Sequence, residues 1–156
     1  MKRRFVLIRW LLSSIRTTGW APAAVFGFYL VASLVFDAYP LYWWLDSVTH
    51  FGGGAALSYF LLDLFDSAGN FIGHIPRPIR LALVFSCVTS AAVFWEFYEF
   101  FSDHLLGTHM QFGQDDTMSD LFFGMLGCVA WLALHALWRR FRCVGKQAAA
   151  EGEAHR

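Results

Sequence analysis

Residues 79–101 read IRLALVFSCVTSAAVFWEFYEFF, a long apolar run that carries two acids, Glu96 and Glu99, in its final third. A helix needs about 20 such residues to cross the hydrocarbon core of a membrane. The run therefore predicts a transmembrane helix with carboxylates near one end. A charge inside such a helix costs about 2.5 to 3.5 kcal/mol on insertion scales, so acids there normally face a protein interior and serve a function.

Three further stretches have the length and apolar character of membrane helices: residues 17–37, 41–63 and 117–138. The chain of 156 residues is 57% hydrophobic and only 15% charged, whereas a soluble domain averages about 25% charged residues. We therefore predict an all-α membrane protein with a bundle of four transmembrane helices. Residues 1–146 are expected to form one polytopic membrane domain, and residues 147–156 a disordered cytoplasmic tail.

The segment before the first predicted span separates its polar and apolar residues onto two helical faces. The polar face carries Lys2, Arg9, Ser13 and Arg16. The opposite face carries Leu7, Ile8, Leu11 and Ile15. This pattern predicts an N-terminal amphipathic helix at the membrane interface, with an extension of the first membrane helix as the alternative. Because Arg9 and Arg16 interrupt the apolar region, we do not expect a cleaved signal peptide.

The basic residues all fall on one side of the predicted topology. The 12 Lys and Arg residues precede the first span, lie between the second and third or at the very start of the third, or follow the fourth. Short loops rich in Lys and Arg stay cytoplasmic, so both termini are predicted to be cytoplasmic. Asp63 and Asp66 end the second span on this side, where a salt bridge to Arg77 or Arg80 would explain them. The 12 acids balance the cations to zero net charge, which argues against a nucleic-acid partner.

The acids gather at the opposite, outer level of the bundle. Asp46 and His50 are four residues apart, Glu96 and Glu99 are three apart, and Asp116 and Asp120 are four apart, so each pair shares a helical face. Three separate regions of the chain thus deliver polar side chains to one depth. The sequence between residues 81 and 138 holds six carboxylates and no Lys or Arg.

Clustered acids at low dielectric must be protonated or neutralised by a cation. Carboxylates with an imidazole suit Zn, Mn, Mg or Fe. We predict a divalent metal bound by Asp46, His50, Glu96, Asp116 and Asp120, with Glu99 and Glu96 as the catalytic carboxylates. The alternative role for Asp116 is that of a helix N-cap. Asp103 and Asp115 also lie near this level, and the alternative for them is that they are solvated loop acids.

Small residues lie close to the acids along the chain. Gly54 with Ser58, and Gly124 with Cys128, form small-xxx-small pairs that let membrane helices approach closely. We interpret them as packing that joins the second and fourth predicted helices beneath the acids, and a local opening of the backbone beside a ligand as the alternative. Cys87 and Cys128 stand in apolar runs and are interpreted as small core residues.

The ordered polar series resembles a known family. The segment DSVTHFGG at residues 46–53, EFYE at 96–99 and DTMSD at 116–120 followed by Gly124 are similar to the YjdF-like bacterial inner-membrane proteins. More distantly they resemble the VanZ-like proteins, although Glu99 and Asp120 stand where those proteins have amides. The resemblance implies a multi-pass protein of the bacterial inner membrane and names no reaction.

Two functional hypotheses follow from these observations. The first is a metal-dependent membrane hydrolase or transferase that acts on a lipid or lipid-linked substrate. The alternative is a non-enzymatic membrane protein that handles a cation, a headgroup or protons, because chains of Asp, Glu and His serve such relays. A structural role for protonated, hydrogen-bonded acids is a third interpretation. Membrane lipids are the expected partners, and the sequence leaves the oligomeric state open.

Overall fold

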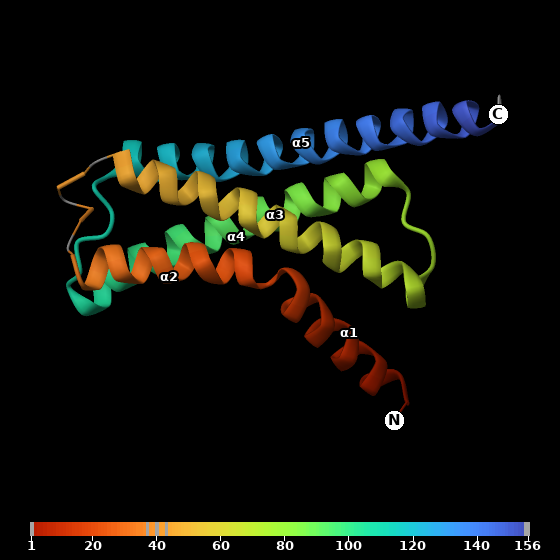
Figure 1. Cartoon of the computed structure of the whole chain (residues 1–156). Helices are drawn as coiled ribbons and strands as arrows, with labels where there is room; N and C mark the ends of the chain where they lie inside the picture. Colours follow the sequence, from red (N-terminus) through yellow and green to blue (C-terminus); the bar gives the residue numbers. More distant parts are fainter. Residues whose placement is uncertain (1, 37, 40, 43, 155–156) are drawn as a thin grey trace.

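The computed structural model describes residues 2–36, 38–39, 41–42 and 44–154, and within these ranges the side chains from Val6 to Arg142. The described residues form five helices: α1 (Lys2–Thr18), α2 (Trp20–Leu34), α3 (Trp44–Ile72), α4 (Arg77–Leu106) and α5 (Gln114–Ala154). The α2–α3 and α4–α5 connections lie at one end of the molecule, and both chain ends and the α3–α4 connection lie at the other (Figure 1).

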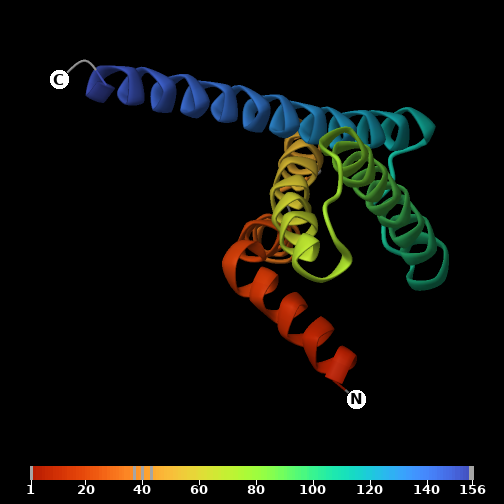
Figure 2. The same cartoon turned by 90° about the vertical axis from the view of Figure 1, so that its right-hand side faces the viewer.

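Helix α3 is the element against which the other four helices pack. Its most extensive packing is against α5, which crosses over α3 and α4 at a large tilt (Figure 2). The described chain is therefore all-helical, as predicted, but its helices do not confirm a regular four-helix bundle. The helix α5 continues to Ala154, past the position at which the sequence predicts a tail to begin.

The number of membrane spans differs from the four that we predicted. Within the described residues, Arg77–Leu106 and Gln114–Arg142 are long and apolar enough to cross a membrane. A third candidate is the pair Val6–Thr18 and Trp20–Leu34, which is bent by 61°. With 15 residues, α2 is only about 22 Å long, short of the roughly 30 Å hydrocarbon core. Helix α3, which carries Asp46, Asp63 and Asp66, is not among these candidates.

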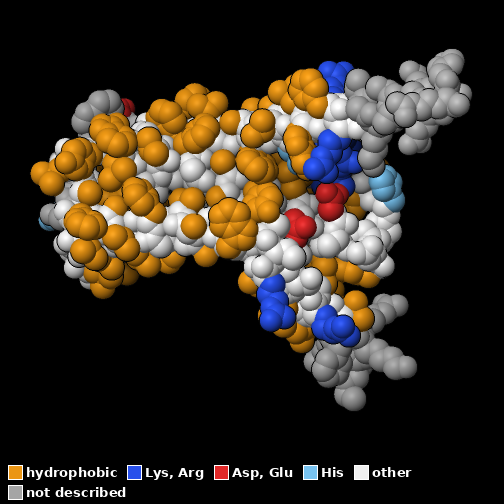
Figure 3. Space-filling view, in the orientation of Figure 1, with side chains coloured by type: hydrophobic (Ala, Val, Ile, Leu, Met, Phe, Trp, Pro, Cys, Tyr) orange, Lys and Arg blue, Asp and Glu red, His pale blue; other side chains and the backbone are white. Residues whose placement is uncertain are grey.

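The surface supports a membrane environment for the helices. Apolar side chains cover most of the face in Figure 3, while Lys and Arg gather at the end that holds the chain termini. Phe94 and Phe101 of α4 are more than half exposed, as is Phe122 of α5. Exposed apolar surface of this extent is unusual for a soluble monomer and typical of contact with lipid.

A small core holds α3, α4 and α5 together. Leu62 of α3, Val84 and Val88 of α4 and Cys128 of α5 are almost completely buried in one cluster. The expected core role is thus confirmed for Cys128. It is wrong for Cys87, which is exposed on α4, because an apolar run that spans a membrane does not show which of its faces is turned away from the other helices.

Polar contacts fix α1 to the middle of α3. The hydroxyls of Thr17 and Thr18 donate to Asp63 Oδ2 at 3.2 and 3.3 Å. Asp63 was expected to pair with an arginine, but α1 supplies its partners instead; the expected salt bridge is found between Asp66 and Arg80. The amphipathic segment therefore has a protein-facing polar edge as well as its apolar face.

Replacing Trp10 by Phe should loosen α1 by about 1 kcal/mol, the usual net contribution of a hydrogen bond. The Trp10 indole N–H donates to the Leu64 carbonyl (3.2 Å) and to Ser67 Oγ (2.8 Å), and Phe would keep the edge contact with Phe71. Hydrogen exchange of the α1 amides measures the effect. Trp20→Phe is the matched control, because Trp20 is 63% exposed; equal exchange in both variants would contradict the assignment.

Candidate functional site: a buried carboxylate cluster

Three helices bring acids together at the end of the molecule that holds the α2–α3 and α4–α5 connections. The first turns of α3 supply Asp46 and His50, α4 supplies Glu96 and Glu99, and α5 supplies Asp120. The i,i+3 and i,i+4 spacings put the members of each pair on one helical face, as expected. The structure thus brings together five of the six side chains that the sequence singles out.

Close approach of α3 and α5 places Asp120 beside His50. A Cβ atom on Gly54 would overlap the backbone carbonyl of Gly124, and one on Gly127 would overlap the carbonyl of Phe51. Only glycine permits this crossing, because any side chain would push the two backbones apart. The expected packing of the two helices through Gly54 and Gly124 is confirmed; the contribution of Gly127 was missed because it belongs to neither small-xxx-small pair.

Two overlapping triplets of ligand atoms result from this crossing. The ligand atoms of Asp46, His50 and Asp120 lie within 4.8 Å of one another, and so do those of Glu96, Glu99 and Asp120. His50 Nε2 lies 3.5 Å from Asp46 Oδ1 and 3.9 Å from Asp120 Oδ2. Asp120 belongs to both triplets and is therefore the centre of the cluster.

The carboxylates are deeply buried and incompletely hydrogen-bonded. The exposed fractions are 5% for Glu96, 3% for Glu99 and 1% for Asp120. One oxygen of each, Glu96 Oε1, Glu99 Oε2 and Asp120 Oδ2, is buried without a hydrogen-bond partner among the described residues. Buried charges normally carry a partner, because desolvating an unpaired carboxylate is very costly. The cluster therefore requires protons or a cation.

Trp95 and Gln111 occupy part of the remaining hydrogen-bonding capacity. The Trp95 indole N–H donates to Glu99 Oε1 at 2.8 Å. Gln111 Nε2 lies 3.4 Å from Glu96 Oε2 and donates to Thr117 Oγ1 at 3.2 Å. Gln111 was not predicted, since an isolated amide in a loop has no spacing pattern that would mark it.

Asp103 organises the loop that carries Gln111. Its carboxylate accepts hydrogen bonds from the Thr108 hydroxyl at 2.6 Å and from the backbone N–H groups of Met110 and Gln111 at 2.8 and 2.9 Å. Gly107 ends α4 in the left-handed conformation, with φ of 68°. Asp103 thus has a structural role in the loop, which is more specific than the solvated acid that was its alternative.

Asp116 lies outside both triplets. Its Oδ2 accepts a hydrogen bond from the Phe112 backbone N–H at 2.9 Å. It lies in the first turn of α5, which begins at Gln114, and so supports the start of the helix without occupying the N-cap position itself. The structure therefore does not bring this predicted metal ligand to the other five side chains.

An apolar cavity of about 190 Å³ lies against the Asp46 and His50 side of the cluster. Residues of α2, α3, α4 and α5 line it, including Val25, Leu57 and Ala92. The Tyr29 ring meets the Trp95 ring edge to face at a centroid distance of 5.0 Å. The site therefore joins a polar cluster to a space suited to hydrocarbon.

A second tyrosine holds the loop before α3 to the cluster. The Tyr39 and Thr49 hydroxyls are 2.9 Å apart. Burial is the main cause that raises the pKa of the Tyr39 hydroxyl above its ordinary value, so Tyr39 remains a neutral hydrogen-bonding group. This contact ties the loop before α3 to the helix that carries Asp46 and His50.

These features define a class: an all-helical membrane protein with a buried acidic site beside an apolar cavity. The chain belongs to the family described as Predicted membrane protein (DUF2238), whose pattern matches residues 3–141. It is 33% identical over 89 residues to an uncharacterized protein of Thermotoga maritima. This match covers 56% of the chain and 45% of the relative, so the chain spans about half of that relative. No solved structure matches the chain.

The family membership confirms the resemblance at its coarser level. The YjdF proteins are in the same family, and the membrane character of the chain agrees with the family description. The likeness to VanZ proteins, the inner-membrane location and the cytoplasmic termini stay predictions. The family description names no substrate, so any activity must be proposed from the site itself.

Proposed function

We propose that this protein is a metal-dependent membrane enzyme that acts on a lipid or lipid-linked substrate. The observation that carries the proposal is the set of buried carboxylate oxygens of Glu96, Glu99 and Asp120 that lack a hydrogen-bond partner among the described residues. No described Lys or Arg forms a salt bridge with them. A divalent cation would supply the missing positive charge, and oxygen-rich donors with one imidazole favour Mn, Mg, Zn or Fe.

The residues can be given separate roles in this proposal. Asp46, His50 and Asp120 would hold the metal, because their ligand atoms lie within 4.8 Å of one another. Bound metal would polarise a phosphoryl or carbonyl group and lower the pKa of a bound water. Glu99 would serve as the general base, because Trp95 fixes one of its oxygens and leaves the other free of described partners.

The adjacent cavity supports a substrate with a hydrocarbon part. Its lining is mostly apolar, and Asp46, Thr49 and His50 are its polar members. An amphiphile could place its chain against α2 and its polar group at the cluster. The inner-membrane location with cytoplasmic termini belongs to the same proposal, since the basic residues gather at the opposite end of the molecule (Figure 3).

Elemental analysis of detergent-purified protein, wild type beside His50→Ala, tests the proposal. We expect about one divalent metal per wild-type chain and much less in the variant. Adding Mn²⁺, Mg²⁺, Zn²⁺ or Fe²⁺ separately to chelated protein should identify the ion, with a stabilisation of about 2.7 kcal/mol at 100 times the dissociation constant. A metal-free wild-type protein whose thermal stability is unaffected by chelation would overturn the proposal.

Proton handling is the second candidate function, and one specific feature favours it. His50 Nε2 lies 3.5 Å from Asp46 Oδ1 and 3.9 Å from Asp120 Oδ2, so a partly exposed acid, an imidazole and a buried acid lie close together. Chains of such groups carry protons in membrane pumps and transporters. If this function is correct, elemental analysis should find a metal-free protein. A separate measurement of proton uptake should then differ between wild type and His50→Ala.

A further inference from the structure

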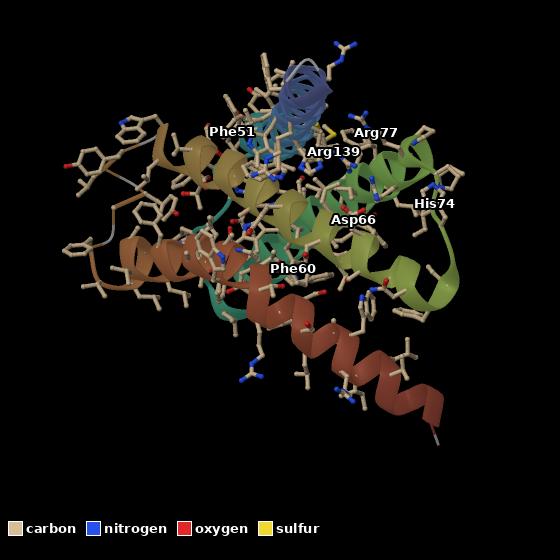
Figure 4. All side chains as sticks on the ribbon, turned by 45° about the vertical axis from the view of Figure 1, so that its right-hand side comes forward. Phe51, Phe60, Asp66, His74, Arg77 and Arg139 are labelled. Atoms are coloured by element: carbon tan, nitrogen blue, oxygen red, sulfur yellow. The ribbon has the colours of Figure 1, made fainter. Side chains whose placement is uncertain are left out.

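A second polar site lies at the other end of the molecule, where α3, α4 and α5 meet. We call it the basic cleft; it has a volume of about 970 Å³ and contains four arginines. Its lining residues are Asp66, His74, Arg77, Arg80, Leu137, Arg139, Arg140 and Phe141. Figure 4 shows Arg77, His74 and Arg139 at this end together with Asp66. None of these residues belongs to the carboxylate cluster.

The basic cleft has an uncompensated positive charge. Of its five permanently charged side chains, four are arginines and one is the acid Asp66, which gives a formal excess of three positive charges. Asp66 already pairs with Arg80. Arg77, Arg139 and Arg140 form no salt bridge with a described acid. Like charges held in one cleft repel one another, so an anion bound there would relieve the repulsion.

The start of α4 adds to this attraction. Arg77 is the first residue of the 30-residue helix, and no side chain caps its N-terminal end. The first N–H groups of a helix have no intrahelical acceptor, and the helix dipole is positive there. Arg80, one turn further along α4, pairs with Asp66 and keeps a buried Nε that has no hydrogen-bond partner among the described residues.

The geometry points to a phosphate-bearing anion as the ligand of the basic cleft. Guanidinium groups bind phosphate through paired hydrogen bonds, and several of them can share one phosphate. Leu137 and Phe141 are more than half exposed and give the cleft an apolar wall. This chemistry fits the headgroup of an anionic phospholipid, and basic pockets between membrane helices recognise such headgroups. A free phosphate compound offers the same chemistry without the chain.

Binding by the full-length protein in detergent tests this inference, with phosphatidylglycerol, phosphatidylcholine and inorganic pyrophosphate as probes. We expect phosphatidylglycerol to raise the melting temperature and phosphatidylcholine to leave it unchanged. The double variant Arg77→Gln with Arg139→Gln should bind phosphatidylglycerol about tenfold more weakly or worse. Stabilisation by pyrophosphate as well would support the phosphate site and identify a free phosphate compound as a second source of ligand.

Arg142→Gln is the matched control, because it removes the same charge from α5 outside the lining of the cleft. Its guanidinium lies 3.7 Å above the Trp138 ring, and its binding should equal that of the wild type. Arg140→Gln, at an exposed position of the cleft, should weaken binding about threefold even if the double variant fails to fold. Equal binding by wild type, Arg140→Gln and Arg142→Gln, or equal binding of the two phospholipids, would overturn the inference.

Discussion

Asp120→Asn should lower the affinity for a divalent metal by about 100-fold, while Asp116→Asn should change it by less than about threefold. Replacement of residues that merely support metal ligands costs 10- to 100-fold, so loss of a direct ligand should cost at least the upper value. Asp120 is 1% exposed and belongs to both triplets, whereas Asp116 is engaged with the Phe112 N–H. Calorimetric titration of each variant with the metal identified by elemental analysis measures both affinities.

The two variants form a closely matched pair. Both replace an aspartate by its amide on α5, one helical turn apart, so they change charge and helix propensity alike. A large loss in Asp116→Asn with none in Asp120→Asn would contradict the site as the structure arranges it. It would indicate instead a metal bound around Asp116, outside both triplets.

Gly54→Ala should destabilise the fold by about 3 kcal/mol, the upper part of the range for overpacked cores. The added Cβ would overlap the Gly124 carbonyl, and backbone on a crossing helix cannot rotate out of the way as a side chain can. The neighbouring Gly53→Ala meets nothing within 4 Å. It should gain up to about 1 kcal/mol, since Ala is the better helix former.

Unfolding in mixed micelles, with and without added metal, measures the effect of both glycine variants. Gly127→Ala provides a second variant at the same crossing, because its Cβ would overlap the Phe51 carbonyl. Equal stability of Gly53→Ala and Gly54→Ala would show that α3 and α5 are not in backbone contact. In that case the position of Asp120 beside His50 would also be wrong.

The length of the apolar stretches predicts the helices well, but it predicts less well which of those helices are membrane spans. The predicted stretch at residues 79–101 lies inside α4, which runs from Arg77 to Leu106. The helix α3 continues to Ile72 beyond the expected end at residue 63. A carboxylate at position 63 suggests a helix end, but hydrogen bonds from Thr17 and Thr18 allow it to stay inside the helix. Such partners come from distant sequence and leave no local pattern.

The candidate site likewise has one part that the sequence predicts and another part that it does not. Spacing within a helix is enough to place Asp46 with His50 and Glu96 with Glu99 on common faces. The position of Asp120 among them depends on the crossing at Gly54, for which the small residues give a usable signal. Loop geometry is different, because Asp103 folds residues 107–113 through three hydrogen bonds that sequence spacing does not encode. Sequence spacing therefore gives no sign of Gln111, and it does not predict that Asp116 lies outside both triplets.

The position of Asp120 in both ligand triplets has a consequence for stoichiometry. Two ions bound at once would have to share this carboxylate as a bridge, with one ion facing His50 and the other facing Glu96 and Glu99. Bridged pairs of this kind, about 3.5 to 4 Å apart, clamp both the attacking and the leaving oxygen of a phosphoryl group. With metal bound, the two halves of the cluster would therefore be thermodynamically linked, and filling one would alter the affinity of the other.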